Sequence, residues 1–221
     1  MQVLFRNQYI VDFVATVMFF TRIPINWAYF SDDPPDLTKA IWAFPLIGYL
    51  IGFFSGLIGD TCLFIGLPIF LSCLIAIAFS IMVSGAFHED GLADMADGFG
   101  AGGSSERVNE IMHDSRLGTY GVITLTLGLL IRVGLTVGLV DLGFSITLIL
   151  AIGFASGKLA IVITRKFFSP SDFAKTGTII GFISIKRFVF AIFTWLMPIT
   201  FILPLFSILT GVILAAIAIF L

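Results

Sequence analysis

Long apolar stretches separated by short polar breaks dominate this chain. A helix that crosses a bilayer needs about 20 mostly apolar residues. Six stretches approach or reach that length, at residues 40 to 58, 62 to 86, 119 to 140, 144 to 164, 187 to 203 and 204 to 221. We therefore predict an all-α fold, a polytopic integral membrane bundle with about six transmembrane helices in a single membrane domain.

The breaks between the predicted spans are short. They fall at residues 59 to 61, at 141 to 143 and between Pro198 and Pro204. Breaks of this length predict tight reversals between antiparallel neighbours, although a proline can also kink a transmembrane helix without ending it. Residues 8 to 25 are apolar but contain Asp12, and we interpret them as an N-terminal interfacial or re-entrant helix.

Composition agrees with a location in the bilayer. Of the 221 residues 58% are hydrophobic and 12% are charged, and the mean hydropathy is +1.09, which leaves too little polar surface for a soluble globule of this size. The net charge is -2 and no cluster of basic residues alternates with aromatics, so we do not expect nucleic acid as a partner. We expect the lipid bilayer as a partner.

The basic residues predict the orientation, because short cytoplasmic loops collect Lys and Arg. Ten of the twelve fall before the first span or in the two long polar segments, at Arg6, Arg22, Lys39, Arg107, Arg116, Arg165, Lys166, Lys175, Lys186 and Arg187. We therefore predict a multi-pass protein of the cytoplasmic (inner) membrane, with an acidic catalytic loop at 87 to 118 and a second loop at 165 to 187 both facing the cytoplasm.

The acidic segment concentrates the charged side chains. It holds both histidines of the chain, His88 and His113, and the charged residues Glu89, Asp90, Asp94, Asp97, Glu106, Arg107, Glu110, Asp114 and Arg116. In a helix, Asp90, Asp94 and Asp97 would share one face and would repel one another unless a cation lay between them. Carboxylate oxygens suit Mg²⁺ or Mn²⁺. The alternative is a solvated face without a ligand.

A glycine-rich stretch at 98 to 103 leads into Ser104 and Ser105, which are candidate N-caps of a short helix. Such a helix start can bind phosphate, but a plain hinge explains the glycines equally well. On the helix, Arg107, Glu110 and Asp114 share a face. With Arg116 they would suit a diphosphate, or else they form ion pairs that face water.

Two basic residues lie inside predicted spans. Arg132 and Lys158 would be costly in lipid, so we expect them to face the bundle interior, where they could hold a phosphate or pair with acidic groups, unless they snorkel to the interface. His88 and His113 could act as acid or base, and neither has nucleophile spacing to a Ser or Cys.

Two long motifs carry a resemblance. GAFHEDGLADMADG at 85 to 98 and EIMHDSRLGTYG at 110 to 121, with FTRIP at 20 to 24 and FPLIG at 44 to 48, closely resemble cobalamin synthase, the adenosylcobinamide-GDP ribazoletransferase of bacteria and archaea. Members of that family carry a further motif, Thr-Gly-Asp-x-x-Gly-Ala, after their last apolar stretch, and it does not occur in this sequence.

The resemblance implies a Mg²⁺-dependent transfer that joins adenosylcobinamide-GDP and α-ribazole, or its 5'-phosphate, and releases GMP. It implies Asp90, Asp94 and Asp97 as catalytic residues that bind metal. Glu89 or His88 would orient or deprotonate the hydroxyl, and Arg107 and Arg116 would hold phosphate oxygens. The further candidates for substrate binding are Arg22, Glu110, Asp114, Arg132 and Lys158.

Two other functions stay open. A CDP-alcohol phosphotransferase also presents aspartates from a membrane helix, but its Asp-Gly-x-x-Ala-Arg string does not occur here. A divalent cation transporter would place acidic residues near the middle of spans, whereas these lie at one end. The sequence leaves the oligomeric state open, a homo-oligomer included.

Overall fold

The computed structural model describes residues 7 to 170 and 179 to 202, and within them the regular elements are all helices, which confirms the predicted fold class. These residues belong to two compact units. Of the described residues, one unit comprises 7 to 19, 23 to 52, 151 to 170 and 179 to 202, and the other comprises Phe20–Arg22 and Phe53–Leu150. Helices α3 (Phe44–Phe64) and α8 (Ile146–Phe167) contribute residues to both units.

The first unit is held together by hydrogen bonds between its helices. It contains α1 (Gln8–Phe20) except for its last residue, η1 (Trp27–Tyr29), α2 (Leu37–Ala40), η2 (Ile41–Ala43) and α9 (Ile185–Ile202). Asp12 is buried and accepts a hydrogen bond from Trp42 Nε1 at 3.1 Å. The Tyr49 hydroxyl donates to the Trp195 carbonyl at 2.6 Å, which joins α3 to α9.

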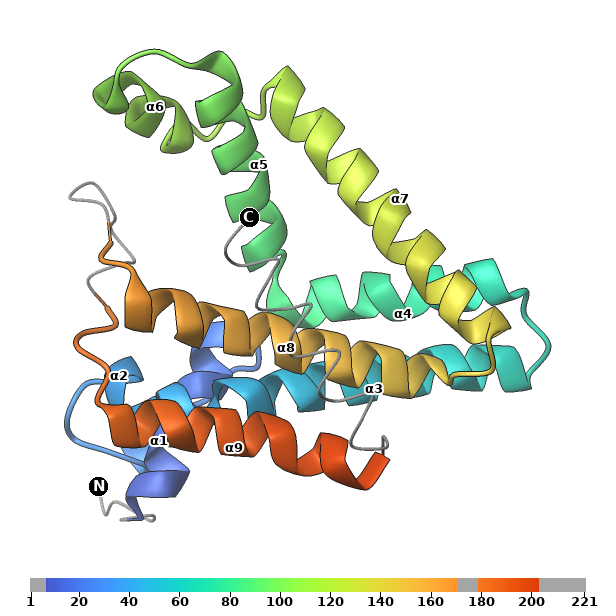
Figure 1. The fold of residues 1–221 in the computed structure, drawn as a ribbon, viewed down its shortest axis with the longest axis horizontal. Coiled ribbons are helices and arrows are strands. Elements are labelled where there is room, and N and C mark those ends of the chain that lie inside the picture. The colour runs from blue at the N-terminus through green and yellow to red at the C-terminus, as the bar shows by residue number, and fades with distance from the viewer. Residues whose placement is uncertain (1–6, 171–178, 203–221) are drawn as a thin grey trace. The chain divides into compact units, whose positions relative to one another are not determined.

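The second unit contains the acidic segment. Helix α4 (Ile69–Ser84) is followed by α5 (Phe87–Ala101) at a bend of 88°. Next come α6 (Ser105–Met112) and α7 (Thr119–Asp141). Within this unit α7 packs against α5 and then against α4 (Figure 1). The acidic segment is therefore not a loop but two helices, α5 and α6, joined by a short glycine turn.

The predicted reversal at residues 59 to 61 is wrong, because α3 continues through it to Phe64. Asp60 looks like a break in the sequence, but its side chain accepts hydrogen bonds from the amides of Ile146 and Thr147 at 2.9 and 3.0 Å. These amides belong to the first turn of α8 and have no partner within their own helix. The chain reverses instead at residues 65 to 68, where Gly66 has a φ of 91°.

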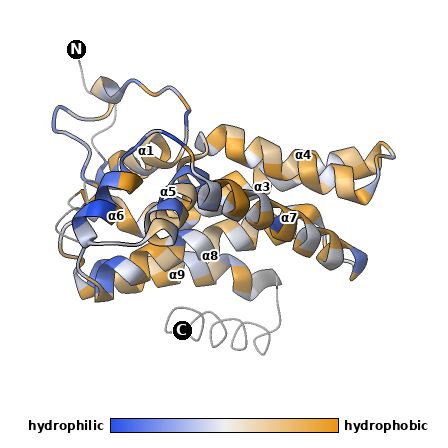
Figure 2. Ribbon diagram, turned by 90° about the horizontal axis from the view of Figure 1, so that it is seen from above, coloured by the Kyte–Doolittle hydropathy of each residue, from blue (hydrophilic) through white to orange (hydrophobic). Residues whose placement is uncertain are grey.

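Three helical segments in the described residues are long and apolar enough to cross a membrane: Leu37–Phe64, Thr119–Asp141 and Ile146–Phe167. A fourth results if the bent pair α4 and α5 forms one broken span. Apolar residues run along α3, α4 and α7, whereas α6 is largely hydrophilic (Figure 2). The chain is thus a polytopic helical membrane protein, and α9 covers most of the span predicted at 187 to 203. The span predicted at 204 to 221 lies outside the described residues.

Candidate active site

The site is built on the bend between α4 and α5. Gly85 ends α4 in the left-handed conformation with φ 68°, and Ala86 follows with φ 59°, a conformation that non-glycine residues rarely adopt. The Arg22 amide donates to the Val83 carbonyl at 2.8 Å, and the Arg22 side chain fills the space beside Gly85. Arg22 therefore packs across the bend and does not line the cavity described next.

A cavity of about 570 Å³ lies between α5, the end of α6 and the start of α7. Its volume falls in the range of small-ligand pockets, roughly 300 to 1,000 Å³. It is lined by Ala86, Glu89, Asp90, Ala93, Asp94, Met112, His113, Asp114, Ser115, Arg116, Leu117 and Leu125. The two acidic motifs, which are separate in the sequence, therefore form the walls of one cavity.

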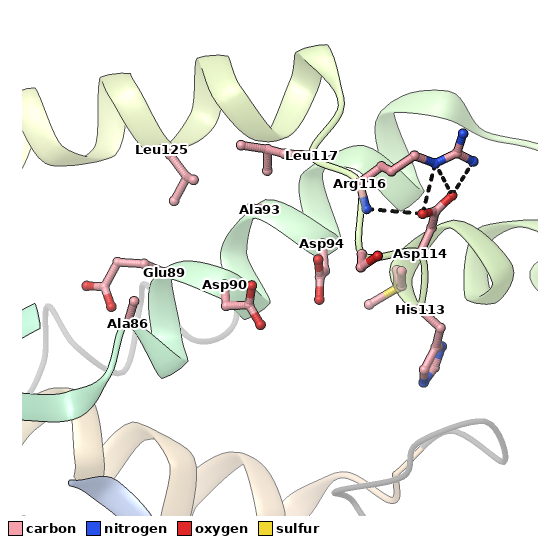
Figure 3. A pocket seen from close by; sticks show the side chains of 12 residues that line it. Ala86, Glu89, Asp90, Ala93, Asp94, His113, Asp114, Arg116, Leu117 and Leu125 are labelled. Atoms are coloured by element: carbon pink, nitrogen blue, oxygen red, sulfur yellow. Dashed lines mark hydrogen bonds and ion pairs between the residues drawn. The ribbon is translucent and has the colours of Figure 1, made fainter. Parts of the chain in front are cut away.

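Asp90 and Asp94 lie four residues apart on α5 and project into the same space (Figure 3). The third aspartate does not join them, because the two Asp97 oxygens accept hydrogen bonds from the amides of Gly118 and Gly121 at 2.7 and 2.8 Å. Within residues 7 to 170 and 179 to 202, no three His, Cys, Asp or Glu side chains are grouped to hold a metal ion. The predicted trio is thus a pair in this cavity.

Glu89 is oriented by Arg132 of α7. Arg132 Nη1 donates to Glu89 Oε1 at 2.9 Å, and the side chains are 37% and 13% exposed respectively. Glu89 Oε2 is buried without a hydrogen-bond partner. Arg132 thus pairs with an acidic group, one of the two roles expected for it from the sequence, and it does not itself line the cavity.

Asp114 and Arg116 form an ion pair at the edge of the cavity. Arg116 Nη2 donates to Asp114 Oδ2 at 2.6 Å, and Nε donates to both carboxylate oxygens at 3.0 and 3.1 Å (Figure 3). Hydrogen bonds from Arg116 hold the pKa of Asp114 at about 2, and Asp114 in turn raises the pKa of Arg116. Arg116 therefore stays charged across the neutral range, and its side chain is 86% exposed at the edge of the cavity.

The other predicted phosphate ligands on α6 do not reach the cavity. Arg107 Nη1 pairs with Glu110 Oε2 at 2.6 Å, and both side chains are exposed. They form an exposed ion pair within one helix, which is the alternative considered from the sequence, and neither residue lines the cavity. The helix itself begins as predicted, since Ser104 caps it by accepting a hydrogen bond from the Arg107 amide.

The glycine-rich stretch serves packing and turning. A Cβ at Gly98 would lie 2.6 Å from Met112 Cγ, and a Cβ at Gly100 would collide with the Tyr120 ring. Gly102 and Gly103 adopt positive φ angles of 67° and 108° and turn the chain into α6. Of the two interpretations left open by the sequence, the structure supports the hinge.

The two histidines are placed differently. The His88 ring lies against Phe20 and Phe87, with centroids 5.9 and 5.3 Å away, and is not part of the cavity lining. His113 lines the cavity, and its Nδ1 lies 2.8 Å from the Asn109 carbonyl oxygen. A carbonyl only accepts, so Nδ1 carries the proton and Nε2 is left as the basic nitrogen.

The sequence offered both histidines as an acid or base, and the resemblance suggested His88 for the role. In the structure, His113 lines the cavity and His88 does not. Lys158, the remaining candidate, is 2% exposed in α8 and belongs to the first unit, so it is not part of this cavity.

Comparison with known proteins identifies the family. A sequence model described as cobalamin-5-phosphate synthase matches residues 12 to 221. The chain belongs to this family. The match includes both walls of the cavity and confirms the resemblance carried by the two long motifs. No solved structure matches the chain.

Curated relatives of this cobalamin-5-phosphate synthase family member carry the name adenosylcobinamide-GDP ribazoletransferase. The protein of Azorhizobium caulinodans is 38% identical over 168 residues, which is 75% of this chain and 64% of the relative. That of Xanthobacter autotrophicus is 42% identical over 127 residues, 55% of this chain and 47% of the relative. That of Clostridium botulinum is 39% identical over 144 residues, 63% of this chain and 56% of the relative. The chain thus spans about half to under two thirds of the length of these relatives.

Proposed function

We propose that the chain joins adenosylcobinamide-GDP to α-ribazole, or to α-ribazole 5'-phosphate, in cobalamin biosynthesis. A ribazole hydroxyl oxygen forms a bond to the phosphorus that stays with the corrinoid, the bridging bond of the diphosphate breaks, and GMP leaves. The observation that carries this proposal is the cavity in which Asp90 and Asp94 lie across from the Asp114 and Arg116 pair. The names of the relatives supply the substrates.

The carboxylate pair fits Mg²⁺ that arrives with a diphosphate. Mg²⁺ is commonly held by one or two carboxylates, with water and substrate phosphates completing its six ligands. Asp90 and Asp94 would supply the two carboxylates, and Mn²⁺ would fit the same oxygens. When bound, the ion would neutralise charge that develops on the diphosphate oxygens.

Arg116 is placed to bind the substrate phosphates. Its guanidinium is held in one orientation by Asp114, and the cavity wall on the opposite side is acidic. Asp114 occupies Nε and one hydrogen of Nη2, which leaves Nη1 and the second Nη2 hydrogen to donate to phosphate oxygens. Binding the diphosphate between this donor and the carboxylate wall would hold the phosphorus in line with the incoming hydroxyl.

His113 is placed to take the proton of the attacking hydroxyl. Its Nδ1 proton is committed to the Asn109 carbonyl, which leaves Nε2 as the acceptor within the cavity lining. The residues first favoured for this step are less suited: His88 lies among aromatic rings, and one Glu89 oxygen is bound to Arg132. This assignment replaces them with a residue from the second motif.

The location of the site is also part of the proposal. The distribution of basic residues favours a protein of the cytoplasmic membrane with the α5 and α6 segment on the cytoplasmic side, where soluble nucleotide substrates are available. The apolar helices support insertion in a bilayer without deciding which membrane it is.

The proposed function is tested by offering the protein alternative donor and acceptor substrates. Purified protein in liposomes is given adenosylcobinamide-GDP or a CDP-alcohol, each with α-ribazole, α-ribazole 5'-phosphate or inositol, and the release of GMP and CMP is followed. We expect GMP alone, and only with a ribazole acceptor. Release of CMP would instead support a CDP-alcohol phosphotransferase, and cation flux that persists without any nucleotide would support a transporter.

A further inference from the structure

Asp97 of α5 caps another helix. Helix α7 begins at Thr119, and its N-cap residue Gly118 has no side chain to satisfy the first amides of the helix. The Asp97 carboxylate takes this role from α5, accepting from the Gly118 amide at 2.7 Å and from the Gly121 amide at 2.8 Å. Asp97 is 8% exposed, so both bonds form away from water, and the start of a helix favours a negative charge.

The two glycines are shaped for this contact. A Cβ at Gly118 would lie 2.5 Å from Asp97 Oδ1 and 2.8 Å from its Cγ, and a Cβ at Gly121 would collide with Asp97 Oδ2. Gly134, farther along the same helix, would place a Cβ in open space. The close approach of the carboxylate therefore explains why glycine stands at 118 and 121.

The contact also fixes the cavity. Gly118 follows Arg116 by two residues, and Arg116 and Asp114 form one wall, while Asp90 and Asp94 on the same helix as Asp97 form the other. A bond between Asp97 and the start of α7 thus sets the separation of the two walls. We infer that Asp97 is a positioning residue that holds the Asp114 and Arg116 wall against α5 and is not a ligand of the metal ion. The inference rests on the proposed function only for the identity of what binds between the two walls, the metal ion and the diphosphate.

A first test does not depend on activity. Hydrogen exchange of the peptide that contains Gly118 and Gly121 is measured in detergent for the wild type, Asp97→Asn, Asp97→Ala and Asp94→Asn. Loss of both charge-assisted bonds in Asp97→Ala should speed exchange there by about tenfold or more. Asp97→Asn keeps one oxygen acceptor and should be intermediate, and Asp94→Asn should match the wild type.

A second test separates positioning from metal binding. In a GMP-release assay, Asp97→Ala should raise KM for the GDP substrate by about tenfold, because Arg116 loses its fixed position. The Mg²⁺ concentration that gives half the maximal rate should stay at the wild-type value. Asp97→Asn should restore part of the KM, since its oxygen still accepts one amide. A metal ligand would behave differently, because Asn in its place would raise the Mg²⁺ requirement.

A third test uses the glycines. Gly121→Ala should raise KM on its own. In the Asp97→Ala background the added methyl meets only Leu117 Cδ1, at 2.9 Å, the end of a flexible side chain that can shift, so the double variant should be no worse than Asp97→Ala. Gly134→Ala is the matched control on α7 and should behave as the wild type.

Unchanged exchange at residues 118 to 121 in Asp97→Ala would overturn the inference, and so would additive effects of Gly121→Ala and Asp97→Ala. An Asp97→Asn variant that needs more Mg²⁺ would return Asp97 to the metal site. If the wild type releases no GMP, the proposed function fails, and the exchange experiment still decides whether Asp97 holds α7.

Discussion

The proposed role of His113 depends on a single hydrogen bond. The Asn109 carbonyl fixes the proton on Nδ1, so Nε2 is the nitrogen that can accept a proton from a hydroxyl. We predict that His113→Ala lowers kcat by about a hundredfold, the lower range for loss of a general base, with a smaller effect on KM. Added imidazole should recover part of the rate in this variant and not in Asp94→Asn. A His113→Ala enzyme with wild-type kcat would exclude this role.

The Asp114 and Arg116 pair predicts a pH dependence. The pKa of Asp114 lies at about 2, below its ordinary value of 3.8, because hydrogen bonds from Arg116 stabilise the charged carboxylate. Because the folded protein lowers the pKa of Asp114, the ion pair contributes its full stabilisation above about pH 3.8. This stabilisation is lost as the pH falls through about 2. The pair should therefore stay intact from about pH 5 to 9.

The measurement compares KM for the GDP substrate in the wild type and in Asp114→Asn across that range. The variant should raise KM by about two- to tenfold, a modest factor because the pair is open to solvent and screened, and by the same factor at each pH. A ratio that changed steeply between about pH 5 and 8 would show that another titrating group positions Arg116.

At the scale of elements, Glu89 and Arg132 join α5 to α7 by an ion pair. Removing one partner leaves a mostly buried charge unpaired, so Arg132→Met should lower the free energy of unfolding by about 1 to 3 kcal/mol, reduced from the fully buried case because Arg132 is partly exposed. Adding Glu89→Gln to that variant should recover part of the loss. Thermal unfolding in detergent measures both, and Lys186→Met at an exposed position of α9 is the control. Equal losses in the single and double variants would show that the pair is not coupled.

The elements also show what the sequence could predict and why the rest was out of reach. Apolar length located α7 and α8. The spacing of Asp90, Asp94 and Asp97 suits one face of a helix, and they do lie on the helix α5, although the segment as a whole was predicted as a loop. The spacing could not show that Asp97 turns to amides more than 20 residues ahead, because that partner exists only once α7 is packed on α5.

Asp60 was misinterpreted for the same reason. A Gly-Asp-Thr sequence resembles a turn, but the Asp60 carboxylate is satisfied by the first amides of α8, which lie 86 and 87 residues ahead. The bend between α4 and α5 falls where the predicted apolar stretch ends, at residue 86, but Ala86 itself carries no local signal for its positive φ. In each case the deciding interaction or backbone conformation has no counterpart in the local pattern.

At the scale of the whole molecule, apolar helices and a small set of charged side chains have separate tasks. The helices make the chain a polytopic membrane protein, and nine of its 26 charged residues lie on α5, on α6 and in the connection to α7. The chain belongs to the cobalamin-5-phosphate synthase family. Its cavity has one wall with Asp90 and Asp94 and another with the Asp114 and Arg116 pair. We propose that this cavity carries out a metal-dependent transfer of a phosphoryl group.

That claim is tested most directly by the Mg²⁺ dependence of GMP release from adenosylcobinamide-GDP with α-ribazole or its 5'-phosphate. The wild type and Asp94→Asn are compared, with Asp141→Asn at the far end of α7 as the control for loss of a carboxylate. We predict Mg²⁺-dependent release by the wild type and by Asp141→Asn, and a loss of about a hundredfold or more in Asp94→Asn at every Mg²⁺ concentration. Undiminished, Mg²⁺-dependent release by Asp94→Asn would contradict the assignment of this cavity as the active site.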